Sequence, residues 1–274
     1  MKAFISDGFT LGAHNLSNQN GETYASWNWK ANGAGSANTD GYISSTVSAN
    51  TTAGFSIAKY TGTGANSSFG HGLGGTPGVY IIKRLNGAAG TWLTYHQSLG
   101  IGYHLGLNNN SAQNANDATF ANNTAPDTSK IYLGNWGDLN NNGSDFICYS
   151  WKEIPGYSKF GSYTGNGNSD GPFIFTGFKP AFVITKRTDA VGDWQLRDSV
   201  RAMASDYPQT PPVLEPHSGN TESSIGGWNF EFLSNGFKQR ETNVTVNASG
   251  GSYIYMAFAS APLVGTNNVP CTAR

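Results

Sequence analysis

Tyr60-Thr61-Gly62-Thr63-Gly64 decides the fold, because this motif returns 103 residues later as Tyr163-Thr164-Gly165-Asn166-Gly167. A proline follows each tyrosine at the same distance and opens an apolar run, which ends in a basic pair before a tryptophan. Such matched spacing indicates two homologous units in tandem. The landmarks are Pro77, Lys83-Arg84 and Trp92 in the first unit, and Pro180, Lys186-Arg187 and Trp194 in the second.

A second element closes each unit and occurs a third time near the start of the chain. Its copies are Phe9–Trp29, Tyr132–Trp151 and Phe237–Phe258, each with an Asn-rich turn that ends in glycine. The pattern predicts a hairpin, since Asn and Gly tolerate positive φ in tight turns. No Tyr-Thr-Gly motif precedes the first copy. Two interpretations stay open: this hairpin caps the following unit, or the chain is a shortened relative of a longer protein.

The last strand of each closing element predicts one packed face. Side chains at i and i+2 lie on the same face of a strand. Ile147-Tyr149-Trp151 and Ile254-Met256-Phe258 are expected to face the core. Phe146-Cys148-Ser150 and Tyr253-Tyr255-Ala257, which are smaller or more polar, are expected to face outward.

The chain predicts an all-β fold of two tandem antiparallel β-sandwich modules, of the jelly-roll or concanavalin-like kind, plus an N-terminal hairpin. Short runs rich in β-branched and aromatic residues alternate with Gly, Asn, Pro and Asp. A single larger concanavalin-like sandwich is the alternative. The expected divisions are residues 1–53 (hairpin and linker), 54–156 (first repeat) and 157–274 (second repeat and tail). Strands are expected at 41–47, 54–60, 79–84, 91–96, 103–107, 130–134, 145–153, 158–164, 173–176, 181–187, 194–197, 228–233, 236–240 and 252–259.

The composition excludes some classes of function. Charged residues are 12% of the chain, about half the usual share, and the net charge is −1. Nucleic-acid binding needs a basic face, so no nucleic-acid partner is expected. No apolar run approaches the length of a membrane span, and the first residues do not form a signal peptide. Cys148 is expected to be a buried free thiol and Cys271 an exposed one.

The best metal candidate is the segment from Asp138 to Asp145. Asp138, Asn140 and Asn142 place oxygen ligands at positions 1, 3 and 5 of a calcium loop, Gly143 stands at position 6, and Asp145 lies nearby. Position 12 lacks the expected Glu. A plain turn is therefore the competing interpretation, and calcium is the single cofactor considered.

Catalytic patterns are not found in the sequence. The histidines lack zinc spacing, no serine lies in a G-x-S-x-G elbow, and nothing orders Glu215 and Glu222 as a catalytic pair. His71 aligns with Phe175 and is expected to pack in the scaffold. Trp92 and Trp194 recur in both units, which predicts repeated core positions. No enzymatic activity is expected.

Trp136 and Trp228 have no counterpart in the other unit, which makes them candidates for a ligand surface. Exposed indole faces suit the apolar side of sugar rings, and Asn140 and Asn142 could add hydrogen bonds. Burial in the core is the competing interpretation for both tryptophans.

Several phrases together resemble a repeat family of virion proteins from phages of marine bacteria and cyanobacteria. The family is associated with tail fibres and with concanavalin-like lectin modules. The resemblance spans Ser6 to Pro262. The phrases are Ser6-Asp7-Gly8-Phe9-Thr10-Leu11-Gly12, Tyr24-Ala25-Ser26-Trp27-Asn28-Trp29, His71-Gly72-Leu73-Gly74, Gly177-Phe178-Lys179-Pro180, Leu233-Ser234-Asn235-Gly236-Phe237-Lys238 and Tyr253-Ile254-Tyr255-Met256-Ala257-Phe258-Ala259.

The resemblance implies a structural, non-enzymatic protein on the surface of a phage particle, made in the host cytoplasm. A tail-fibre or receptor-binding component and a capsid decoration are the two expected roles. The expected partners are other virion proteins, copies of the chain in a homo-oligomer such as a trimer, and a host-surface glycan. A carbohydrate-active hydrolase or carbohydrate-binding module on the same sandwich is the alternative, and a purely structural assembly protein is a third possibility.

Overall fold

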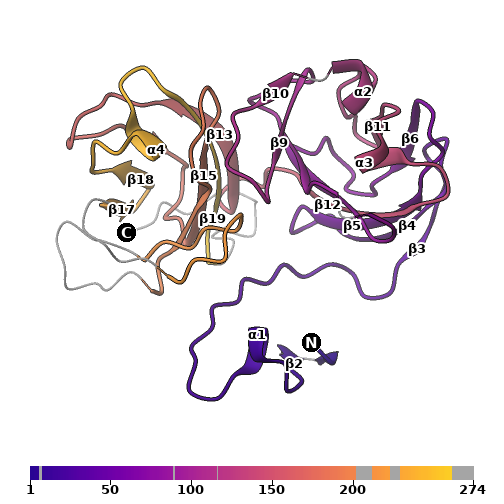
Figure 1. Ribbon diagram of the computed structural model, residues 1–274, viewed down its shortest axis with the longest axis horizontal. Helices are drawn as coiled ribbons and strands as arrows, with labels where there is room; N and C mark the ends of the chain where they lie inside the picture. Colours follow the sequence, from indigo (N-terminus) through magenta and orange to yellow (C-terminus); the bar gives the residue numbers. More distant parts are fainter. Residues whose placement is uncertain (6–7, 89, 116, 202–211, 223–228, 261–274) are drawn as a thin grey trace. The chain divides into compact units, whose positions relative to one another are not determined.

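The chain folds into two units, Met1–Lys30 and Ala31–Arg274. The computed structural model describes residues 1–5, 8–88, 90–115, 117–201, 212–222 and 229–260 (Figure 1). Strands dominate both units, and the helices are four or five residues long. Every pair of named strands is antiparallel, so the all-β prediction is confirmed.

The first sandwich pairs an eight-stranded sheet with a two-stranded one. The large sheet has the order β10-β9-β8-β7-β12-β5-β4-β3, and the small one pairs β11 with β6. Apolar side chains of both sheets, α2 and α3 form one core. The bounds are β3 Ser36–Asn38, β4 Ser45–Asn50, β5 Phe55–Thr61, β6 Ser67–Gly70, β7 Val79–Arg84, β8 Leu93–His96, β9 Tyr103–Gly106, β10 Asn114–Ala115, α2 Asp117–Ala121, β11 Lys130–Leu133, α3 Gly137–Asn140 and β12 Asp145–Trp151.

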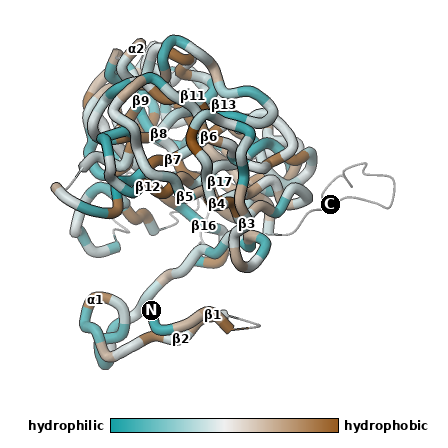
Figure 2. The backbone as a smooth tube through the Cα atoms, turned by 90° about the vertical axis from the view of Figure 1, so that its right-hand side faces the viewer, coloured by the Kyte–Doolittle hydropathy of each residue, from teal (hydrophilic) through white to brown (hydrophobic). Residues whose placement is uncertain are grey.

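The second sandwich has smaller sheets. One has the order β13-β19-β15-β16 and the other β14-β18-β17. Phe230, Phe237 and Tyr255 lie in the core between them. Hydrophobic and hydrophilic stretches are interspersed along the chain (Figure 2). The bounds are β13 Ser158–Thr164, β14 Phe173–Phe175, β15 Phe182–Arg187, β16 Gln195–Asp198, β17 Phe230–Leu233, β18 Gly236–Gln239, α4 Val244–Asn247 and β19 Ser252–Phe258.

The closing elements are arches rather than hairpins, so the hairpin prediction was wrong. In the first sandwich β11 pairs with β6, whereas β12 pairs with β5 and β7 in the other sheet. In the second, β18 and β19 likewise lie in different sheets. The helical turns α3 and α4 carry the chain from one layer to the other. We refer to each strand–helical turn–strand element as a closing arch.

The packed face of the first closing strand, β12, is opposite to the prediction, whereas both faces of β19 are buried. Phe146 and Cys148 lie in the core of the first sandwich, while Ile147 and Tyr149 are half-buried. Tyr255 and Ala257 lie in the core of the second sandwich, and Ile254 and Met256 on the other face are buried as well. Strand β19 is therefore covered on both faces, which an alternation rule based on one packed face does not anticipate.

The segment 31–53 belongs to the first sandwich and is not a linker. Strands β3 and β4 continue its large sheet, with β4 paired along the length of β5. The boundary between units falls at Lys30 and Ala31, not at 53 and 54. The two sandwiches that follow have separate sheets but form a single unit in this division.

Hydrogen bonds join the two sandwiches through buried side chains. His96 Nδ1 accepts from Ser98 N, so Nε2 carries the proton and donates to Tyr255 O at 3.0 Å. The indole of Trp194 donates to Gly106 O at 2.8 Å. Trp194 is buried at this junction, whereas Trp92 is half-buried beside Lys83. The two tryptophans are therefore not equivalent core residues, contrary to the prediction.

The N-terminal unit contains β1 Ala3–Ile5, β2 Gly8–Thr10 and α1 Asn15–Asn18. Strands β1 and β2 pair as an antiparallel hairpin. The predicted strand that ends at Trp29 is not formed: residues 23–32 have no regular secondary structure. A strand needs neighbouring strands to satisfy its backbone groups, and in the described part of this unit no strand pairs with the segment.

Candidate functional site

Asn140, a candidate ligand-binding residue, holds the protein's own backbone. It ends α3 and its side chain is fully buried. Its Oδ1 accepts from Thr63 N at 2.8 Å, and its Nδ2 donates to Ala65 O at 2.6 Å and to Gly134 O at 2.9 Å. The amide thus locks the opening motif Tyr60–Gly64 onto the closing arch.

Asn247 makes the same clamp in the second sandwich. Its Oδ1 accepts from Asn166 N at 2.8 Å, and its Nδ2 donates to Asn168 O at 2.8 Å and to Glu241 O at 2.6 Å. A fully buried amide repeated in both units is part of the scaffold. The signal that could have revealed this was the asparagine three residues before the turn glycine in all three copies.

The two carboxylates of the candidate calcium loop also have partners within the protein. Asp138 Oδ2 accepts from Thr91 N at 3.2 Å. Asp145 accepts from the Thr61 hydroxyl at 3.0 Å and lies 3.3 Å from Lys59 Nζ, and these contacts hold the pKa of its carboxyl below the ordinary value. Asn142 is exposed. Among the described residues, no group of three or more His, Cys, Asp and Glu could hold a metal ion.

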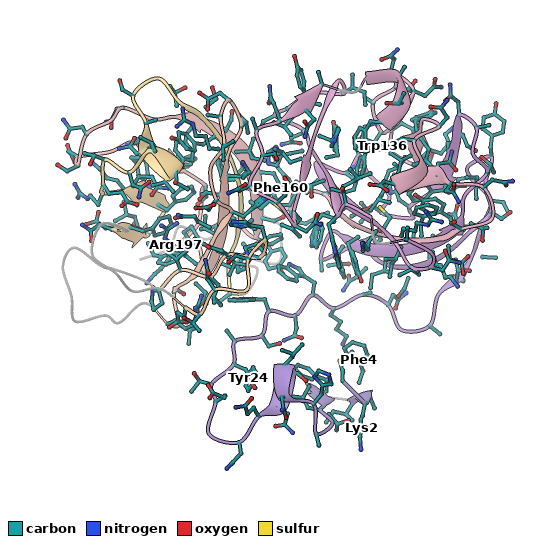
Figure 3. The ribbon with its side chains drawn as sticks, in the orientation of Figure 1. Lys2, Phe4, Tyr24, Trp136, Phe160 and Arg197 are labelled. Carbon is teal, nitrogen blue, oxygen red and sulfur yellow. The ribbon has the colours of Figure 1, made fainter. Side chains whose placement is uncertain are left out.

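Trp136 lies at the start of α3, half-buried, with its ring 4.9 Å from that of His104 (Figure 3). The prediction that it contacts a ligand stays a prediction. Trp228 and Cys271 lie outside the described residues. Cys148 is a buried free thiol, and desolvation raises its pKa to about 12.

A buried polar cluster, missed in the sequence, lies inside the second sandwich. We call it the Arg197 cluster; its members are Tyr163, Gln195, Arg197, Gln239 and Glu241. The guanidinium bonds to Gln195 Oε1, lies 4.0 Å from Glu241 Oε1 and 5.0 Å from the centre of the Phe230 ring. Gln239 Nε2 donates to the Tyr163 hydroxyl at 3.1 Å. Figure 3 places Arg197 within the second sandwich.

Six buried atoms of this cluster have no hydrogen-bond partner among the described residues. Buried polar groups are normally paired with protein or with water. The six atoms are Gln195 Nε2, Arg197 Nε and Nη1, Gln239 Oε1, and both carboxyl oxygens of Glu241.

The first sandwich fills the same positions with apolar groups. In the second sandwich, Arg197 pairs with Val183 and Gln195 pairs with Thr185. At the corresponding positions of the first sandwich, Tyr95 pairs with Tyr80 and Leu93 pairs with Ile82. Leu93 and Tyr95 belong to the hydrophobic core. Comparing residues 93–96 with 195–198 would have revealed the cluster from the sequence, since two apolar residues become Gln and Arg.

Burial shifts the ionisation of both charged groups in the cluster. Desolvation raises the pKa of the Glu241 carboxyl to about 8, against the opposing effect of Arg197. Desolvation also lowers the pKa of Arg197 to about 10, although Glu241 favours its charged form. Burial therefore favours the neutral form of Glu241 and opposes the charge of Arg197.

A groove of about 410 Å³ lies at the junction of the two sandwiches. Ser98 and Gln113 contribute from the first, and Ser162, Thr188 and Ser252 from the second. Asp189 also lines it and accepts from Arg187 Nε at 2.9 Å, which lowers the pKa of that carboxyl. Hydroxyl and amide groups dominate the lining, so the groove suits an uncharged polar ligand.

Comparison with known proteins assigns the chain to a family but not to a function. No curated protein and no solved structure matches it. No helix among the described residues is long and apolar enough to cross a membrane. Residues 1–262 match the family described as a domain of unknown function, DUF7483, so the chain belongs to that family.

Proposed function

We propose that this chain is a non-enzymatic structural protein of a phage particle's surface, either a tail-fibre or receptor-binding component or a capsid decoration. The observation that carries the proposal is a shared strand and helical turn, which open the closing arch of both sandwiches and occur once more at the N-terminus. Units of one design joined in series suit an extended assembly. The partners proposed are other virion proteins and copies of this chain.

The side chains shared by the repeats support a scaffold role. Asn140 and Asn247 are both fully buried and bond to their own backbone. Junction residues such as His96 and Trp194 likewise bond to carbonyl groups of the neighbouring sandwich. These polar groups stabilise the repeat and its junction.

The test is the location of the chain in purified particles. We expect peptides of this chain by mass spectrometry in gradient-purified phage, and an antibody raised against it to label the tail or the capsid in electron micrographs. A chain that stays in the lysate supernatant, while known particle proteins sediment, would refute the proposal.

Glycan binding at the junction groove is the second candidate function. The lining of hydroxyl and amide groups, with Tyr163 and Tyr253 beside them, favours a sugar. Saturation-transfer NMR with host-surface polysaccharide should show contacts that weaken in Gln113→Ala, with exposed Asn142→Ala as the control. Equal signals from both variants would remove the groove from consideration.

A hydrolase in this groove is the less favoured alternative. Glycoside hydrolysis needs two carboxyl groups that flank the scissile bond. Asp189 is the one acidic side chain among the described residues of the lining, and it is paired with Arg187. Release of reducing sugar from host polysaccharide would support this alternative.

A further inference from the structure

The N-terminal unit reproduces the strands β17 and β18 and the helical turn α4 of the second sandwich. Strands β1 and β2 correspond to β17 and β18: the closing pair of the first hairpin is Ile5↔Gly8, and that of the second is Leu233↔Gly236. A helical turn follows in both, α1 in one and α4 in the other. The unit thus contains the first strand and the helical turn of a third closing arch, with the strand before them, and we call this part the N-terminal arch.

The hydrogen bonds of this arch match those of the other two. Asn18 Nδ2 donates to Gly12 O at 3.0 Å, six residues earlier, as Asn140 does to Gly134 O and Asn247 to Glu241 O. Gly21, Gly143 and Gly250, each three residues after the asparagine, all have positive φ. Residues 12–21 therefore adopt the arch conformation without an opening strand beside them.

Tyr24 completes the correspondence. Its hydroxyl donates to Asn15 O at 2.9 Å and accepts from Gln19 N at 2.9 Å. The Tyr253 hydroxyl makes the same two bonds to Val244 O and Ala248 N. Yet Tyr24 is 50% exposed and Tyr253 only 1% (Figure 3 shows Tyr24 in the N-terminal unit).

The difference lies in the partner of the arch. In both sandwiches an opening strand covers the arch: Gly64 N donates to Asn140 O at 2.6 Å, and Gly167 N donates to Asn247 O at 3.0 Å. Asn18 is exposed, and its Oδ1 accepts no hydrogen bond from the described residues. The two opening strands that the structure describes, β5 and β13, already cover arches of their own.

We propose that the N-terminal arch binds an opening strand of the Tyr-Thr-Gly-x-Gly type that belongs to a repeat unit other than the two described here. Asn18 Oδ1 accepts from the backbone amide of residue x, and the Asn18 carbonyl oxygen accepts from the backbone amide of the last glycine. Residues 24–29 then become a strand beside it, as β12 lies beside β5. This inference rests on the proposed function, since it links repeat units in series.

The first glycine of the incoming motif makes the binding of the strand selective. A Cβ on Gly62 would lie 2.5 Å from Asn141 O, and one on Gly165 would lie 2.2 Å from Ala248 O. The same carbonyl in the N-terminal arch belongs to Gln19. A side chain at this glycine should therefore prevent docking while leaving the chain itself unchanged.

The experiment titrates a synthetic peptide of residues 54–70 into the full chain and follows hydrogen exchange by mass spectrometry. We expect at least tenfold slower exchange in residues 18–29, saturable with peptide, and unchanged exchange in β12 and β19. The control peptide carries Gly62→Val and should give no protection. The variant Asn18→Ala should lose the protection given by the native peptide.

Two results would overturn the proposal. One is unaltered exchange of residues 18–29 at saturating, millimolar peptide. The other is protection without peptide that grows with protein concentration, which would assign the arch to a second copy of this chain. A negative peptide result for a chain that is present in particles defeats this inference alone, whereas absence from particles defeats the proposed function.

Discussion

Asn140 and Asn247 occupy the same position in two sandwiches, and each donates to the carbonyl oxygen six residues before it. The acceptors are Gly134 O at 2.9 Å and Glu241 O at 2.6 Å. Each side chain also accepts from the backbone amide at the fourth position of the opening motif, Thr63 or Asn166. One buried amide therefore links the first strand of a unit to its last helical turn.

Replacing either asparagine with alanine should destabilise its own sandwich. Asn140→Ala and Asn247→Ala each remove several buried hydrogen bonds and leave carbonyl groups unpaired, so we expect a loss of about 3 kcal/mol in the free energy of unfolding. Urea denaturation followed by circular dichroism measures this. Asn18→Ala is the control, because its exposed side chain makes a single bond, and it should cost under about 0.5 kcal/mol. Equal effects at all three positions would contradict the clamp.

The first glycine of each opening motif should not tolerate a side chain. Gly165→Val would place a Cβ 2.2 Å from Ala248 O, so we expect a loss of about 2–4 kcal/mol or failure to fold. Gly219→Ala is the control, since nothing lies within 4 Å of a Cβ at that position. Thermal unfolding of the two variants measures the difference, and a Gly165→Val chain as stable as the control would disprove the close approach.

Glu241 should make the stability fall as the pH rises through neutrality. Its pKa is raised to about 8 in the folded protein, so between its ordinary pKa and about 8 the folded state binds more protons than the unfolded state. The stabilisation is complete below the ordinary pKa and is lost as the pH approaches 8. Glu241→Gln mimics the neutral acid and should flatten the dependence of melting temperature on pH from 6.5 to 8.5. A variant with the wild-type slope would contradict this assignment.

The buried histidines also make the stability depend on pH. Burial lowers the pKa of His96 and His104 to about 4. The unfolded state therefore binds more protons below about pH 6.5, and their contribution to stability is lost as the pH falls towards 4. This trend opposes that of Glu241 and fades above about pH 7.5. Burial lowers the pKa of Lys186 to about 8, which makes stability rise with pH at the upper end of the range. The difference in slope between the wild type and Glu241→Gln therefore reports Glu241.

Calcium should leave the melting temperature unchanged. The loop oxygens of Asp138, Asn140 and Asp145 already accept from Thr91, Thr63 and Thr61. A bound ion would raise stability with concentration by mass action. Differential scanning calorimetry in excess EDTA and in millimolar calcium should give matching curves. A calcium-dependent rise that disappears in Asp145→Asn would establish a metal site there.

Local patterns predicted most strands because turn residues bracket each one. The expected strand at 79–84 matches β7, and the one at 158–164 matches β13. The short strands β3 and β6 were missed: Ser36–Asn38 and Ser67–Gly70 are rich in small polar residues and Gly, which do not favour strands. Their positions depend on pairing with neighbours distant in sequence.

The candidate site was less predictable than the fold. Asn140 was singled out as a contact for calcium or a ligand, but its side chain bonds to the protein's own backbone, and two of its three partners lie more than seventy residues away. The Arg197 cluster has no local motif. Its residues come from three strands and a loop, and the pairing of β15 with β16 brings Arg197 to the interior.

The sequence by itself determined the duplication, the all-β class and the glycines of the opening motif, because spacing and turn chemistry are local properties. Only the tertiary structure decided that each closing element crosses between two sheets, and that Phe146 rather than Ile147 faces the core. It also decided that residues 24–29, which share the pattern of β12 and β19, form no strand. A strand requires hydrogen-bonding neighbours as well as a suitable pattern.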